Sequence, residues 1–191
     1  MAVSWRDIPT YEGLYQISNE GEVRSLQGIS KRKNILTGGY SYRKGKVLTP
    51  DVSTGYKRVK LCKYDNGKWW CVHKLLYCIE HNLNIHADLK IDHKDRNKLN
   101  NSLDNLRLAT SQENNRNIGK RTDNCSSIYK GVSFSKNNKK NPWRAGIRIG
   151  KKCIHLGYFN NEKDAAEAYD KKALELFKDF AYLNKNLLEA I

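Results

Sequence analysis

Residues 89–117 read LKIDHKDRNKLNNSLDNLRLATSQENNRN and bring acid, imidazole and amide side chains close together in the chain. Asp92 and His93 are neighbours at the end of a short β-type run, and Asn105 and Asn114 follow them. A carboxylate beside a histidine, with an asparagine returning from a short helix, can place two oxygen ligands and one nitrogen base around one point. Oxygen ligands suit Mg²⁺, which keeps several waters and takes further ligands from phosphate. This stretch indicates phosphodiester hydrolysis, with a neutral imidazole removing a proton from water and the cation stabilising the leaving oxygen.

The flanking residues predict the local structure around these side chains. Residues 55–76, GYKRVKLCKYDNGKWWCVHKLL, contain two alternating β-type runs around Asp65-Asn66-Gly67, which is a strong hairpin signal. A helix is expected next, because apolar residues recur with helical spacing at Val72, Leu75, Leu76 and Ile79. Thr110 and Glu113 form a T-x-x-E capping box, which predicts a short helix directly after Thr110.

The same residues resemble the His-Asn-His (HNH) family of ββα-metal endonucleases, in its phage and intron-encoded homing form, over residues 55–118. The resemblance implies that His93 is the general base and that Asp92 and Asn114 are the metal ligands. It also implies that Asn105 fixes the loop around His93. The implied cofactor is Mg²⁺, with Mn²⁺ as a substitute. Asn114 stands where some members have the final histidine, as in the His-Asn-Asn subset, and it keeps an oxygen ligand.

Other polar and aromatic residues of this region are interpreted as structural. His73 opens the predicted helix, and packing or capping is favoured for it over a role beside the site. A zinc set is the less favoured alternative, since no C-x-x-C pair occurs among its candidate ligands, Cys71, His73, Cys78 and His81. The five cysteines are expected to be reduced thiols. Trp69 and Trp70 are neighbours on a strand and so face opposite sides, which places one of them in the core.

The N-terminal segment is predicted to be a small β-rich module. Alternating residues surround turns at Gly13 and Gly21. The segment is similar to the modular domain that recurs at the N-terminus of HNH nucleases, at Trp5, Ile8, Pro9, Tyr11, Gly13, Tyr15, Ile17, Ser18, Gly21 and Val23. Residues 23–50 contain no acid and seven bases, Arg24, Lys31, Arg32, Lys33, Arg43, Lys44 and Lys46. Two interpretations stay open for this run, a solvated connector or a segment that follows a phosphate backbone.

The C-terminal third changes composition after a polar linker. Three β-type runs, YKGVSF, PWRAGIRI and KCIHLGYF, precede a helical pattern with small alanines, so a basic sheet backed by a helix is expected. Arg144 and Arg148 lie four apart and therefore share a strand face. This segment resembles the apetala/ethylene-response-factor DNA-binding domain over residues 127–185. The resemblance implies DNA-facing positions at Lys130, Trp143, Arg144, Arg148 and His155. A core position is an equal alternative for Trp143, since large aromatic residues usually anchor small domains. Ser133 and Ser135 replace arginines common in plant members, so the plant recognition sequence does not transfer.

Composition agrees with a nucleic-acid partner. The chain has 191 residues, and 35 Lys+Arg against 20 Asp+Glu give a net charge of +15, which favours a polyanion. With 39% hydrophobic residues it can build cores. No apolar run long enough for a membrane span or secretory signal is present. We expect a monomeric, non-secreted protein of the cytoplasm, or of the host cytoplasm if phage-encoded, without an obligate protein partner.

These observations predict a modular α+β protein with a central ββα-metal core, a β-rich N-terminal module and a C-terminal three-stranded antiparallel sheet on one helix. The expected segments are a module at 1–53, a nuclease domain at 54–118, a linker at 119–127 and a DNA-binding domain at 128–185. The expected activity is that of a homing-type, site-directed double-stranded DNA endonuclease with one divalent metal. A non-catalytic DNA-binding regulator on a degenerate nuclease core is the alternative, against which the intact Asp92, His93 and Asn114 argue. A basic RNA-binding protein would explain the charge but not this constellation.

Overall fold

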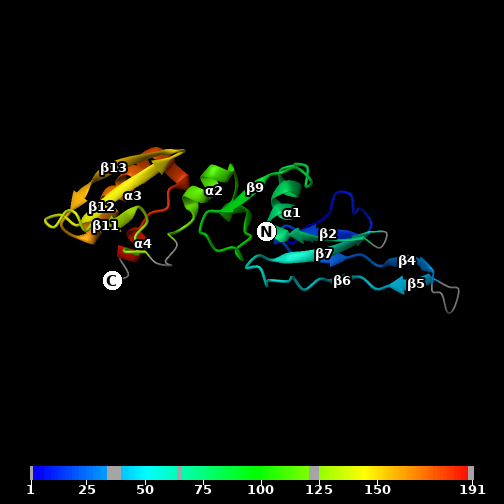
Figure 1. Ribbon diagram of the computed structural model, residues 1–191. Coiled ribbons are helices and arrows are strands. Elements are labelled where there is room, and N and C mark those ends of the chain that lie inside the picture. Colours follow the sequence, from blue (N-terminus) through cyan, green and yellow to red (C-terminus); the bar gives the residue numbers. More distant parts are fainter. Residues whose placement is uncertain (1, 34–39, 64–65, 121–124, 189–191) are drawn as a thin grey trace. The chain divides into compact units, whose positions relative to one another are not determined.

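The computed structural model describes residues 2–33, 40–63, 66–120 and 125–188 (Figure 1). They form two compact units, Met1–Thr110 and Ser111–Ile191. Among the described residues, the first unit contains small antiparallel sheets, one α-helix and the short 3-10 helix η1 (Leu103–Asn105), and the second contains a three-stranded antiparallel sheet with a long helix packed on it. The predicted α+β class is therefore confirmed. No helix within the described ranges is long and apolar enough to cross a membrane.

A four-stranded antiparallel sheet begins the first unit. Its order is β1 (Trp5–Asp7), β2 (Tyr15–Ser18), β3 (Val23–Ser25) and β6 (Lys46–Val47). The predicted turns are present, with Gly13 at φ 70° and Gly21 at φ 81°. These are left-handed conformations that glycine adopts without steric cost.

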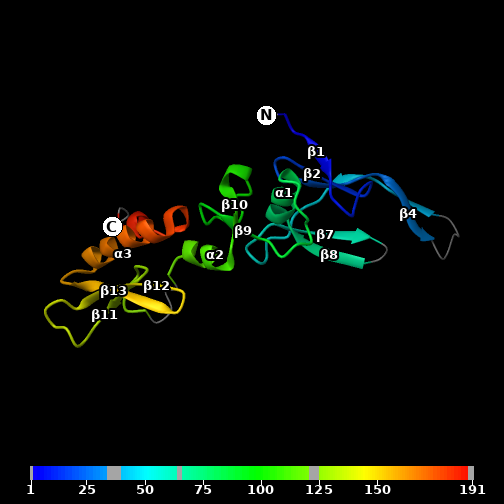
Figure 2. The ribbon, with the colours of Figure 1, turned by 90° about the horizontal axis from the view of Figure 1, so that it is seen from above.

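A second antiparallel pair, β4 (Gly28–Lys33) and β5 (Tyr40–Arg43), reaches away from the rest of this unit in both views (Figures 1 and 2). Together with β6 it runs through the basic segment at residues 23–50. The described part of that segment is therefore built largely of paired strands.

The predicted hairpin is confirmed as β7 (Arg58–Lys63) and β8 (Asn66–Cys71), although residues 64–65 of its turn lie outside the described residues. Alternation along β8 buries Trp70, which is 5% exposed, and leaves Trp69 49% exposed, as two neighbouring strand residues must face opposite sides. Helix α1 (Val72–Glu80) follows without a loop and buries the predicted apolar stripe.

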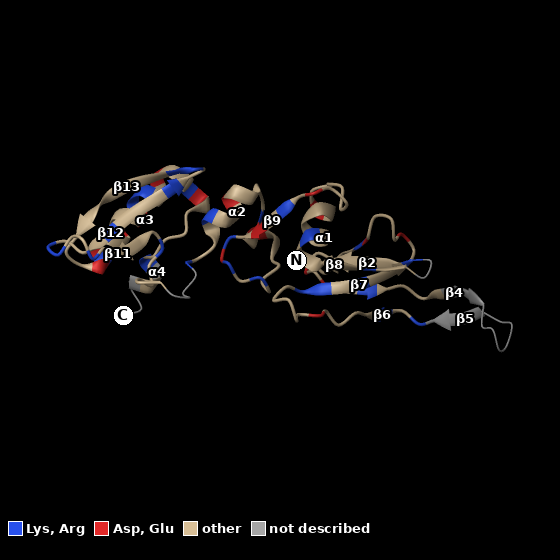
Figure 3. Ribbon diagram, viewed as in Figure 1, with Lys and Arg blue, Asp and Glu red and all other residues tan. Residues whose placement is uncertain are grey.

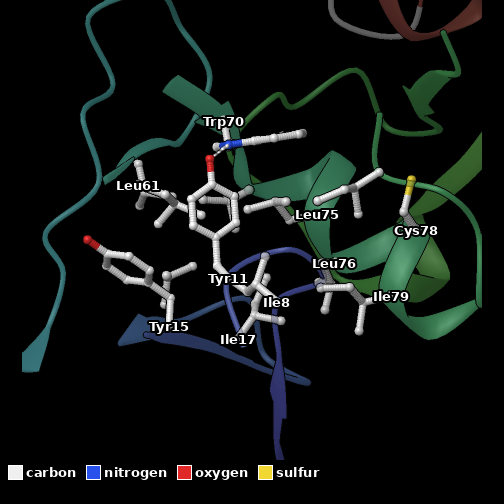
Figure 4. Packing of buried hydrophobic residues seen from close by; sticks show 14 residues of the cluster. Ile8, Tyr11, Tyr15, Ile17, Leu61, Trp70, Leu75, Leu76, Cys78 and Ile79 are labelled. Atoms are coloured by element: carbon white, nitrogen blue, oxygen red, sulfur yellow. Dashed lines mark hydrogen bonds between the residues drawn. The ribbon is translucent and has the colours of Figure 1, made fainter. Parts of the chain in front are cut away.

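One hydrophobic core joins the N-terminal sheet, the hairpin and α1 (Figure 4). Tyr11 and Tyr15 from the first part of the chain lie in this core with Leu61 and Trp70, and the indole nitrogen of Trp70 donates a hydrogen bond of 3.2 Å to the Tyr11 hydroxyl. Each aliphatic side chain buried here contributes about 1.5–3 kcal/mol. Residues 1–53 and the start of the predicted nuclease domain are therefore stabilised by a shared core.

The second unit begins with the predicted short helix, α2 (Ser111–Asn117). The predicted sheet and helix follow as β11 (Val132–Phe134), β12 (Trp143–Ile149), β13 (Lys152–Phe159) and α3 (Glu162–Phe177). Helix α3 covers one face of the sheet, and its Ala165, Ala166 and Ala173 are fully buried. These small side chains allow close approach, as predicted. Two short helices end the unit, η2 (Lys178–Phe180) and α4 (Lys185–Leu188).

Candidate active site

Two short antiparallel strands carry the residues singled out by the sequence. They are β9 (Lys90–His93) and β10 (Leu106–Ala109), with η1 (Leu103–Asn105) before β10. Asp92 and His93 end β9, and the structure brings both into the interior, at 5% and 4% exposure. The register places Asp92 opposite Arg107. A buried carboxylate must be compensated by a partner or a cation.

Arg107 supplies that partner. Its Nε and Nη2 atoms donate hydrogen bonds of 2.9 and 2.7 Å to Oδ2 of Asp92. Both side chains are largely buried, so the attraction is screened less than at a surface. The sequence analysis did not single out Arg107, because its pairing with Asp92 depends on the strand register.

His93 lies in a cluster of rings and amides. Its Nε2 lies 3.1 Å from Oδ1 of Asn101, and its ring makes an edge contact with His73 at 4.9 Å between centroids. The Tyr56 ring is tilted against both imidazoles. His73 was expected to have a packing or capping role, and it does pack, but against the predicted general base.

Electrostatics keep His73 uncharged. Burial, together with the nearby His93 and Lys74, lowers its pKa from 6.5 to about 4. The Nδ1 atom of His73 is buried and has no hydrogen-bond partner among the described residues. A neutral imidazole beside His93 adds no positive charge that would oppose protonation of His93 during a reaction.

The loop between β9 and β10 is held by Asn105. Its side-chain amide donates to Oδ1 of Asp95 and to the carbonyl oxygen of Asn100, both at 2.8 Å, and its Oδ1 accepts from the Asp95 amide. Burial alone would raise the pKa of Asp95, but hydrogen bonds from Asn100, Asn105 and the Asn97 amide outweigh it and lower the pKa. Asp95, Asn97 and Asn100 form successive turns, in which each side-chain oxygen accepts a hydrogen bond from the backbone amide two residues further on. Asn105 thus ties the two ends of the loop that follows His93.

The first unit supplies only some of the ligands that a hard divalent cation such as Mg²⁺ needs. Asp92 provides carboxylate oxygens, the ligand type that Mg²⁺ takes, one or two per site, together with waters and phosphate. No group of three or more His, Cys, Asp and Glu side chains able to hold a metal occurs in the described ranges. Asn114 lies on α2 in the other unit, and its pairing with Asp92 stays a prediction.

Two residues predicted to face DNA, Arg144 and Arg148, share one side of β12. Arg144 and Arg148 are exposed, whereas Ala145 and Ile147 between them are buried under α3. The register shifts between Ala145 and Gly146, so β13 carries one extra residue and His155 lies opposite Gly146. Arg144 Nε is 3.4 Å from Nδ1 of His155, which places the two predicted contacts together. Lys and Arg mark this sheet and its loops, while α3 carries both signs (Figure 3).

Other predicted DNA-facing residues have internal contacts. Lys130 Nζ donates to the carbonyl oxygens of Arg116 and Ile118, at 2.7 and 2.5 Å. Trp143 is half-buried and packs on the core of the second unit. Arg24 donates to Oε1 of Gln16 and lies 4.1 Å from the Trp5 ring centroid. Lys31, Arg32 and Lys33 lie on β4, but their side chains are outside the described part of the structure.

Two family models match the chain. The NUMOD4 motif model matches residues 4–62 and the HNH endonuclease model matches residues 76–116. The second match contains Asp92, His93 and Asn105, together with Asn101 and Arg107, which sequence reasoning missed.

Several curated proteins are similar. DNA endonuclease I-HmuI of Bacillus phage SP01 is 38% identical over 113 residues, which cover 59% of this chain and 55% of that protein. Uncharacterized HNH endonuclease L560 of Acanthamoeba polyphaga mimivirus is 40% identical over 123 residues, covering 64% and 60%. H-N-H endonuclease F-TflII of Escherichia phage T5 is 42% identical over 78 residues, covering 39% of each chain.

The chain spans at most about three fifths of the length of these relatives. A solved structure described as DNA binding and cleavage by the HNH homing endonuclease I-HmuI is 37% identical, with a TM-score of 0.45, and covers 60% of this chain and 56% of that chain. Residues 4–62 therefore match the NUMOD4 motif, residues 76–116 match the HNH endonucleases, and the chain is similar to I-HmuI over part of its length.

Proposed function

We propose that this chain is a site-directed, homing-type endonuclease that hydrolyses phosphodiester bonds of double-stranded DNA with one Mg²⁺. The observation that carries the proposal is the buried Asp92–His93 pair at the end of β9, followed by a loop that Asn105 ties down. The match of residues 76–116 to the HNH endonucleases supports it. Fixed orientation of such groups is what hydrolysis demands of a protein, because a misplaced base or ligand loses most of its effect.

In the proposed reaction His93 removes a proton from the attacking water. The water oxygen forms a bond to phosphorus, the bond from phosphorus to the leaving oxygen breaks, and the imidazole holds the proton as imidazolium. Asp92 and Asn114 would hold the cation, which stabilises negative charge on the leaving oxygen. Asn105 keeps the loop after His93 in place. His73 stays neutral beside the imidazolium and does not repel it.

We further propose a division of labour along the chain. The second unit would be an apetala/ethylene-response-factor-like domain whose exposed face, with Arg144, Arg148 and His155, enters a DNA groove. Lys130 and Trp143 were also predicted to contact DNA, and both make internal contacts within the second unit. The basic residues Arg24, Lys31, Arg32 and Lys33 would meet phosphates.

The proposed segments are 1–53, 54–118, 119–127 and 128–185, and the proposed protein is a cytoplasmic monomer. The NUMOD4 match and the core shared by residues 1–53 with the hairpin suggest that the first module also supports the nuclease fold.

The decisive experiment incubates the full chain with supercoiled plasmid in Mg²⁺, Mn²⁺ or EDTA. We expect nicked or linear DNA with either cation and none with EDTA. His93→Ala and Asp92→Ala should abolish cutting and keep DNA binding, and Asn114→Ala should follow them. His81→Ala is the matched control, because His81 is an exposed histidine of the same unit that stacks on Tyr77. Undiminished cutting by folded His93→Ala would refute the catalytic assignment, and binding without cutting by the natural chain would favour the regulator.

DNA contacts are tested by the salt dependence of binding. Replacing Lys31, Arg32 and Lys33 together by alanine should flatten the slope of log affinity against log salt by up to about 0.9 per lost phosphate contact. Arg144→Ala should instead relax preference at one base position at a cost of about 1–3 kcal/mol if this arginine reads a base. An unchanged slope and unchanged site choice would remove both surfaces from the proposal.

A further inference from the structure

Asn101 is a polar neighbour of His93 to which neither the sequence reasoning nor the family match assigns a role. It lies in the loop after β9 and is only 6% exposed. Its Oδ1 lies 3.1 Å from Nε2 of His93, in a buried contact between two side chains eight residues apart. The loop that presents it is the one that Asn105 ties down, through the Asn100 carbonyl next to Asn101.

The chemistry of this contact selects one form of the imidazole. An amide oxygen accepts hydrogen bonds and cannot donate them, so the nitrogen that faces it must carry the proton. A neutral imidazole carries one ring proton, and the hydrogen bond made by one nitrogen sets the role of the other. With the proton on Nε2, the basic lone pair is on Nδ1.

Asn101 does not have the environment of an ordinary structural amide. Its Nδ2 is buried and has no hydrogen-bond partner among the described residues. An asparagine retained only to stabilise a loop is normally satisfied at both ends, as Asn105 is. In Asn101 the side-chain oxygen contacts His93, and the side-chain nitrogen has no partner among the described residues. The contact with His93 is therefore the polar contact that the structure gives for this buried side chain.

The surroundings of the ring support a fixed orientation. The His73 ring makes an edge contact with the His93 ring, and the Tyr56 ring packs against the His93 ring at a tilt. These contacts restrict rotation of the imidazole, so that the Nε2 edge keeps facing Asn101. Uncompensated rotation would also leave a buried ring nitrogen without its partner, which is costly.

We propose that Asn101 is a positioning residue that holds His93 in its Nε2-protonated tautomer, so that Nδ1 is the atom that takes the proton from water. The inference rests on the proposed nuclease function for its catalytic consequence, but the tautomer itself is a property of the folded protein. Asn101 acts through His93 and does not touch the reacting atoms.

The first test reads the tautomer directly and needs no activity. Long-range ¹H–¹⁵N spectra of the full chain labelled at histidine, in metal-free buffer at pH 8, distinguish a protonated Nε2 from a protonated Nδ1. The His93 signal is assigned by its loss in His93→Gln. We expect the Nε2-protonated pattern for the natural chain and for Asn101→Asp, whose carboxylate accepts the same hydrogen bond. Asn101→Ala should give a mixture of both tautomers.

The second test measures plasmid cleavage by the same variants. Asn101→Ala should lower kcat about 10- to 100-fold, as is typical when a partner orienting a functional side chain is removed, with KM changed less than threefold. Asn101→Asp should recover part of the loss. Asn97→Ala is the control, because Asn97 accepts a turn hydrogen bond from the Leu99 amide in the same loop and has no contact with His93 given by the structure. It should change neither the tautomer nor kcat.

The outcomes separate the two proposals. The role of Asn101 is refuted if His93 is protonated on Nδ1 in the natural chain, or if Asn101→Ala leaves the tautomer of His93 unchanged. Either result refutes it even if the protein cuts DNA. If His93 is protonated on Nε2, and Asn101→Ala changes this tautomer, the positioning role of Asn101 is supported. If the same protein does not cut DNA, the nuclease function is refuted. If Asn101→Ala does not fold, the tautomer of the natural chain and of Asn101→Asp still decides.

Discussion

Acidification should destabilise the first unit through His73. Its pKa is about 4 in the folded protein against an ordinary value of 6.5. Between these two values the unfolded chain binds a proton at His73 and the folded protein does not, so protonation favours unfolding. The stabilisation is complete above pH 6.5 and is lost as the pH falls towards 4. At about 1.4 kcal/mol per pH unit, its full size is about 3 kcal/mol.

The perturbation that isolates this contribution is His73→Phe. Phenylalanine keeps a ring against His93 and Tyr56 and cannot titrate. It also removes the buried Nδ1 that lacks a partner, which contributes about 1–3 kcal/mol of penalty in the natural chain. At pH 7.5 the variant should therefore be as stable as the natural chain or more so. Other acid-sensitive groups, such as Asp95, are common to both proteins and cancel in the comparison.

The assay is urea unfolding at intervals from pH 7.5 to 4, followed by tryptophan fluorescence. Three of the four tryptophans, Trp5, Trp69 and Trp70, lie in the first unit, so this signal reports mainly on the part that contains His73. The difference in unfolding free energy between variant and natural chain should grow by about 3 kcal/mol over this range. Parallel pH profiles would refute the reasoning, because they would mean that His73 is protonated as easily in the folded protein as in the unfolded chain.

Two further changes test packing and charge. Arg107→Gln should destabilise the metal-free first unit by about 3 kcal/mol, because it removes the guanidinium from the buried carboxylate of Asp92. Thermal unfolding with and without Mg²⁺ should show that the cation raises the Tm of this variant more than that of the natural chain. Equal rises in Tm would contradict a metal role for Asp92. Gly131→Ala should destabilise the second unit by about 3 kcal/mol, since φ is 79° and a Cβ would overlap the Tyr169 ring. Gly150→Ala is its control, as φ is also positive but nothing lies within 4 Å, and its cost in calorimetry should be only about 1 kcal/mol.

Local patterns determined most of the secondary structure. The apolar stripe of α1, the alternation along β7 and β8 and the alanine stripe of α3 are properties of a few neighbouring residues, and each formed as predicted. The same holds for the burial of Trp70 over Trp69, because side chains alternate along any strand. The residues of the motif around Asp92 and His93 were likewise recognisable from their spacing alone.

Tertiary packing decided what surrounds those residues. His73 and Asn101 reach His93 only because α1, the end of β9 and its loop fold together, and nothing in their spacing distinguished them from other histidines and asparagines. Arg107 meets Asp92 through a strand register that depends on the whole pairing of β9 with β10. The shared core of the N-terminal sheet and the hairpin is similarly invisible in sequence, because hydrophobic burial is non-directional and a pattern shows which face is apolar but not what covers it. Sequence thus determined the elements and indicated the candidate reactive side chains, while contacts between distant residues determined what surrounds them: the neutral ring of His73, the Arg107 partner of Asp92 and the Asn101 contact of His93.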